Sequence, residues 1–158
     1  MAVNQPFFKY QGEYVKKIIF IISILAFVLI NNAQAESNQE GDITQVMLNQ
    51  WDTPQNPLTV GPIVVAGKYA IAGWIQGVKG GRALLYKNHE NWQVLLCGGD
   101  ALTKVDQLTQ AGLDIRVANS LIKEFKKQEQ QLSSQEIEKM SLFDGIVKVT
   151  PTVVHQHH

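Results

Sequence analysis

The chain has 158 residues, one cysteine and equal numbers of acidic and basic side chains, 14 of each. This charge balance excludes a strongly basic chain, so the composition does not suggest nucleic acid as a partner. A single cysteine also excludes an internal disulfide, so its thiol is a buried apolar group, a metal ligand or a reactive group.

The first 35 residues have the pattern of a secretion signal. Lys16 and Lys17 precede an apolar run from Ile18 to Ile30, and Ala33-Gln34-Ala35 offers small residues for cleavage. The run is shorter than the roughly 20 apolar residues of a membrane-spanning helix, and an uncleaved anchor is the alternative. Residues 1–14 make a long leader, so Val15 is a candidate for the true start. We therefore expect residues 1–35 to be a Sec-type signal peptide.

Cleavage after Ala35 would leave a mature chain of 123 residues (158 − 35). Lys9, Lys16, Lys17 and Glu13 leave with the signal, so 11 basic and 13 acidic side chains remain. The net charge of about −2 indicates neither nucleic acid nor an anionic membrane as a partner. The length predicts a single domain over residues 36–150, followed by a histidine-containing tail at 151–158.

A helix is predicted first in the mature chain, with Asp42 as its cap. Its apolar residues recur at helical spacing: Ile43, Val46, Met47 and Trp51. Strands are then predicted at 58–65, 69–76, 82–87 and 92–97, with turns at 66–68, 77–81 and 88–91. Gly61-Pro62 interrupts the first strand and predicts an edge or a bulge. Consecutive hairpins predict an antiparallel meander of three to four strands.

The C-terminal half has the pattern of helices. Asp100 is predicted to cap a helix that ends at Gly112, and Asp114 to cap a second one. Ser133 and Glu136 have the spacing of a capping box for a short third helix, and residues 143–149 predict a short final strand. Because strands and helices are segregated, we predict an α+β fold with two to three C-terminal helices packed on one sheet face.

Cys97 ends a predicted strand just before Gly98-Gly99-Asp100 begins a helix. That position can lower the pKa of a thiol, which suits a nucleophile or a soft-metal ligand, whereas packing in the core is the alternative. A cysteine hydrolase needs a histidine beside the thiol. His89 lies at the other end of the same strand, about 25 Å away at roughly 3.3 Å per residue, which argues against a catalytic dyad.

Other candidate residues have structural alternatives. The glycine-rich segment 77–82 joins two strands, so it is neither a Walker loop nor a dinucleotide fingerprint. Arg82 is predicted to lie against Trp74 or a neighbouring ring, or on the surface. Met47 and Met140 lie on apolar helical stripes and are predicted to pack in the core. The three tryptophans are also predicted to pack in the core or at its edge, and the alternative is that they line a pocket between helices and sheet. They are Trp51, Trp74 and Trp92.

Three of the last four residues are histidines: His155, His157 and His158. Imidazoles this close together can share a Cu(II) or Zn(II) ion, and a solvated tail without metal is the alternative.

Several runs, taken in order, resemble the copper uptake system-associated proteins of Gram-negative bacteria. They are Gln50–Pro54, Leu58–Pro62, Ala70–Gly77, Gly80–Leu85, Trp92–Asp100 and Phe143–Gly145. The similarity covers nearly all of the mature chain. It implies a small periplasmic protein that is encoded beside copper-acquisition components, including outer-membrane copper receptors. Cys97 is the matched position whose chemistry suits copper.

Our first hypothesis is a non-enzymatic, periplasmic accessory protein of copper uptake, with a copper uptake receptor or chaperone as its partner. Cys97 would bind Cu(I) together with a second ligand or a second chain, and the histidines of the tail would bind Cu(II), with His89 as a further candidate. The second hypothesis is an interaction or structural module that binds no metal and buries Cys97. A small hydrolase or isomerase is the third, although the sequence has no recognisable His–Asp pair or pair of carboxylates.

Overall fold

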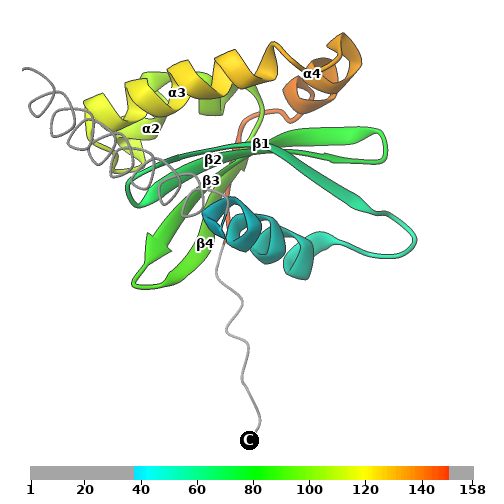
Figure 1. Ribbon diagram of the computed structural model, residues 1–158. Helices are drawn as coiled ribbons and strands as arrows, with labels where there is room; N and C mark the ends of the chain where they lie inside the picture. The colour runs from blue at the N-terminus through cyan, green and yellow to red at the C-terminus, as the bar shows by residue number, and fades with distance from the viewer. Residues whose placement is uncertain (1–37, 150–158) are drawn as a thin grey trace, which may run out of the picture. The chain divides into compact units, whose positions relative to one another are not determined.

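The computed structural model describes residues 38–149, which form an α+β fold, as predicted (Figure 1). A five-stranded sheet lies between an N-terminal helix, residues 38–51, and the C-terminal helices. Residues 39–149 belong to a single compact unit. The predicted signal peptide, the start at Val15 and the histidine tail lie outside the described residues. No helix within residues 38–149 is long and apolar enough to cross a membrane.

The sheet is an antiparallel meander in which each strand pairs with the next one along the chain. Its strands are β1 (Leu58–Ala66), β2 (Tyr69–Gln76), β3 (Lys79–Asn88), β4 (Asn91–Gly98) and β5 (Ile146–Lys148). The expected final strand thus adds a fifth strand to the meander, beside the end of β4. Gly67 and Gly77 make the first two turns with a φ of 62° each, a backbone conformation that glycine adopts without steric cost.

The predicted flexible turn at 77–81 is wrong beyond Val78, because Gly80 and Gly81 are buried within β3. A Cβ on Gly80 would lie 2.8 Å from the backbone carbonyl carbon of Lys139 in α4 (Ser134–Ser141). A Cβ on Gly81 would lie 2.7 Å from the Trp74 ring. These glycines therefore allow close packing of a helix and a ring against β3.

Two irregularities determine which side chains face the N-terminal helix. The β1–β2 register shifts between Val60 and Ile63, around Gly61-Pro62, and β1 lies at the edge of the sheet, so both of the predicted alternatives hold. The β3–β4 register shifts between Leu84 and Leu85, so that β4 carries one extra residue. That extra residue places Cys97 in the same core cluster as Trp92 and Val94, whereas Leu96 packs on the opposite face.

A hydrophobic cluster covers each face of the sheet. On one face, Ile43 and Met47 of the N-terminal helix are fully buried against residues such as Ala72 and Leu85. On the other, helix α3 (Ile115–Glu129) buries Leu121 and Phe125, among others. In the apolar stripe predicted for the N-terminal helix, Ile43 and Met47 are fully buried, and Val46 and Trp51 are partly buried beside them. The predicted burial of Met140 is also confirmed.

The C-terminal helices begin largely as their capping residues predicted. Asp114 accepts a hydrogen bond from the backbone N–H of Arg116 (2.8 Å), and Ser133 and Glu136 form the predicted capping box. The helix predicted from Asp100 is instead a single 3₁₀ turn, η1 (Asp100–Thr103), followed by extended Lys104 and the short α2 (Val105–Gln110). Asp100 caps nothing, because its carboxylate accepts hydrogen bonds from Arg82 and Ser141 instead.

The predicted cap at Asp42 is also wrong. The helix already includes residue 38, and Asp42 is an exposed residue in its interior. The polar residues before Asp42 continue the helix, and the hydroxyl of Thr44 donates a hydrogen bond to the Glu40 carbonyl one turn earlier (2.8 Å). The helix ends at residue 51, shortly before Pro54 and Pro57, residues that cannot continue a helix.

Candidate binding cavity

An apolar cavity of about 230 Å³ lies on the face of the sheet that the N-terminal helix covers. Four parts of the chain contribute to it: the end of the N-terminal helix, β1 with β2, the end of β4, and the segment around β5. The lining residues are Trp51, Leu58, Trp74, Gln76, Cys97, Phe143, Val147 and Val149.

The wall of the cavity depends on the position of the Trp74 indole. This ring lies over Gly81, where any side chain on β3 would collide with it. Phe143 meets the ring edge-on, with the centroids 6.0 Å apart and the planes at 82°. Aromatic pairs favour this geometry, so the two rings hold each other in place.

The cavity offers mainly apolar surface to an occupant. The Gln76 amide is already used, because it donates to the carbonyls of Trp51 and Asn56, each at 2.8 Å, and so anchors the loop after the N-terminal helix. The indole N–H of Trp74 is buried and has no hydrogen-bond partner within residues 38–149. Val147, which is 52 % exposed, connects the lining to the molecular surface.

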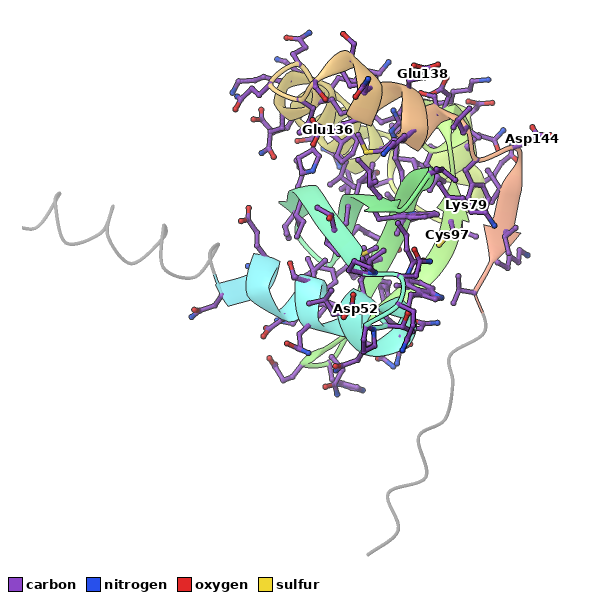
Figure 2. The ribbon with its side chains drawn as sticks, turned by 90° about the vertical axis from the view of Figure 1, so that its right-hand side faces the viewer. Asp52, Lys79, Cys97, Glu136, Glu138 and Asp144 are labelled. Carbon is purple, nitrogen blue, oxygen red and sulfur yellow. The ribbon has the colours of Figure 1, made fainter. Side chains whose placement is uncertain are left out.

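Cys97 is 7 % exposed, and its thiol is part of this apolar wall. Figure 2 labels it within the sheet, with Asp52 after the N-terminal helix on one side and Glu136 and Glu138 of α4 on the other. Burial raises the pKa of Cys97 to about 11, because an apolar environment disfavours the thiolate. Of the two alternatives that the sequence left open, burial agrees with packing in the core, and the helix that could have lowered the pKa of the thiol is only one 3₁₀ turn. The thiol is therefore protonated at neutral pH.

The structure does not bring His89 and Cys97 together. His89 is exposed in the β3–β4 turn with a φ of 52°, whereas Cys97 lies at the far end of β4. Within residues 38–149, no group of three or more His, Cys, Asp and Glu side chains could hold a metal ion. His155, His157 and His158 lie outside this range.

Arg82 is 2 % exposed, so the surface position is wrong, and the ring it lies against is that of Phe125 rather than Trp74. Its Nε donates to Glu129 at 2.8 Å, and its Nη1 donates to Asp100 at 3.1 Å and to the Met140 carbonyl at 3.2 Å. Its guanidinium also lies 5.9 Å from the centroid of the Phe125 ring. Arg82 thus ties β3 to η1, α3 and α4, and it lies on the face opposite the cavity cluster.

No local sequence pattern marks Phe143, Val147 and Val149 as cavity residues. Side chains alternate between the two faces of β2, so the sequence places Trp74 and Gln76 on the same face as Ala70 and Ala72. The rest of the lining depends on the pairing of β5 with β4 beside Cys97, a contact between positions 50 residues apart in the chain.

Comparison with known proteins identifies no relative: no family model matches the chain, and neither does any curated protein or solved structure.

Proposed function

We propose that this chain is a non-enzymatic accessory protein of periplasmic copper uptake, and that its folded domain binds a partner protein through the Cys97 cavity. The resemblance of the ordered sequence runs supports the link to copper uptake. The observation that carries the binding role is the cavity itself, which is apolar, is lined by three aromatic rings and reaches the surface at Val147.

The size of the cavity favours a side chain as its occupant over a cofactor. Pockets for drug-sized ligands and cofactors usually enclose about 300–1,000 Å³, whereas an engineered apolar cavity of about 150 Å³ holds a benzene molecule. A volume of about 230 Å³ therefore suits one large apolar side chain or two small ones. Such anchors in desolvated pockets often carry most of the binding energy of a protein interface.

Cys97 has a defined part in this proposal, as a small protonated wall residue. A Cu(I) site at this position would need the thiolate and at least one further soft ligand. The raised pKa opposes the first requirement. The domain on its own is therefore expected to bind no Cu(I) tightly through Cys97.

The test is the copper content of copper-limited cells that lack the gene and carry a variant copy. Val147→Asp places a charge at the cavity mouth, and Ile115→Asp is the matched control, because Ile115 is 60 % exposed on α3 and outside the cavity lining. We expect Ile115→Asp to restore copper uptake and Val147→Asp to fail. Normal copper content in cells that lack the gene would contradict a role in copper uptake. Full restoration of copper content by Val147→Asp would contradict a role of the cavity.

Direct copper binding by the tail is a second candidate, favoured by three histidines within four residues. It is tested by titrating Glu36–His158 and a chain that ends at Thr150 with Cu(I) and Cu(II) separately. Cu(II) binding that the shorter chain lacks would support it, and equal binding by both chains would contradict it. Tight Cu(I) binding by both chains that Cys97→Ser abolishes would instead restore Cys97 as a ligand.

A further inference from the structure

The described chain ends at the edge of the cavity, because Val149 is one of the lining residues. Nine residues follow it, and they include an apolar pair, Val153 and Val154, just before the histidines. We propose that in the free protein Val153 and Val154 fill the Cys97 cavity, and that a partner must displace them. This inference rests on the proposed function, since it concerns the same cavity.

The reach of the chain is sufficient for this arrangement. Three residues lie between Val149 and Val153, so the two are four residue steps apart and span at most about 14 Å when extended, at 3.3–3.6 Å per residue. A cavity of about 230 Å³ is only about 8 Å across if it is roughly spherical. Pro151 lacks a backbone N–H, so it cannot continue the hydrogen-bonded ladder of β5. The segment can therefore turn back over the lining it has just left.

Two small aliphatic side chains also match what the cavity offers. Its surface is apolar, its one amide is engaged in the loop before β1, and it accepts about the volume of two such groups. A segment joined by a short tether has an effective concentration in the millimolar range. Weak contacts are therefore enough to keep it docked, and a partner with a larger anchor can still replace it.

The test compares the rate at which an aromatic disulfide reagent modifies Cys97 at pH 8 in three mature chains, each Glu36–His158. They are the unchanged chain, the variant Val153→Asp with Val154→Asp, and a control with all three tail histidines replaced by alanine. If the tail fills the cavity nine-tenths of the time, the aspartate variant reacts about tenfold faster, and the control keeps the original rate. Circular dichroism and the urea midpoint verify that all three chains are folded.

Equal rates in the three chains would overturn the inference. A rate in the unchanged chain that falls as its concentration rises would also overturn it, because a second copy would then cover the cavity. Failure of this inference is distinguishable from failure of the proposed function. Equal modification rates combined with loss of copper uptake in Val147→Asp would reject the tail as occupant and keep the partner site.

Discussion

Arg82 has two negative partners, one buried and one exposed. Removing the buried partner, Glu129, should destabilise the domain far more than removing the exposed partner, Asp100. Glu129 is buried with its side chain 10 % exposed, whereas the Asp100 side chain is 66 % exposed. Breaking a buried ion pair by removing one partner typically costs about 3–5 kcal/mol, because the other charge stays buried without compensation. An exposed pair typically contributes about 0–1 kcal/mol. We therefore expect a loss of about 3–5 kcal/mol for Glu129→Ala and of about 1 kcal/mol or less for Asp100→Asn.

The assay is urea unfolding of the mature domain, followed by tryptophan fluorescence. A third variant, Arg82→Met with Glu129→Leu, replaces both charges by apolar side chains of similar length, and we expect it to regain most of the loss in Glu129→Ala. A whole domain is stable by only about 5–15 kcal/mol, so the predicted difference is readily measured. Equal losses for Glu129→Ala and Asp100→Asn would refute the reasoning.

Two further predictions concern packing and pH. Gly80→Ala should lower the free energy of unfolding by about 2 kcal/mol or more, because the new Cβ would press on the α4 backbone. Gly41→Ala is the control: a Cβ at this helical position meets nothing within 4 Å, so the free energy of unfolding should rise by about 0.5–1 kcal/mol. Equal urea midpoints for the two variants would contradict this prediction. The pKa of Cys97 rises from 9.0 in the unfolded chain to about 11 in the folded one, so the folded state binds the additional proton between these values and stability falls as pH rises. We expect Cys97 to contribute about 2–3 kcal/mol to that fall between pH 8 and pH 11, and an equally steep fall in Cys97→Ala would refute it.

The architecture could be predicted because local signals determine it. An almost continuous apolar run defines β2, glycines mark its turns, and the capping residues Asp114 and Ser133 begin α3 and α4. Each of these signals acts over a few residues, within the range of a sequence pattern.

The errors share a different cause, since they depend on contacts between distant segments. Asp100 has the sequence of a helix cap, but Arg82 and Ser141 use its carboxylate. Gly80 and Gly81 have the sequence of a flexible turn, but α4 and Trp74 pack against them. Arg82 follows two glycines in the sequence, and nothing near it indicates that it will be buried and paired with Glu129, 47 positions later.

The cavity was harder to predict than the fold for the same reason. Cys97 faces it only because the β3–β4 irregularity adds one residue, and β5 completes the wall from far along the sequence. The sequence directed attention to the thiol, and the structure changes its surroundings from a helix terminus to an apolar wall.

The measurement that tests the central claim most directly is site-specific photocrosslinking in cells that produce the protein. A photoreactive residue replaces Val147 at the cavity mouth in one strain and Ile115 on α3 in another, and mass spectrometry identifies the adducts. The account predicts an adduct between position 147 and a copper-uptake receptor or chaperone, and none at position 115. Equal adducts at the two positions, or none at position 147 in copper-limited cells, would contradict it.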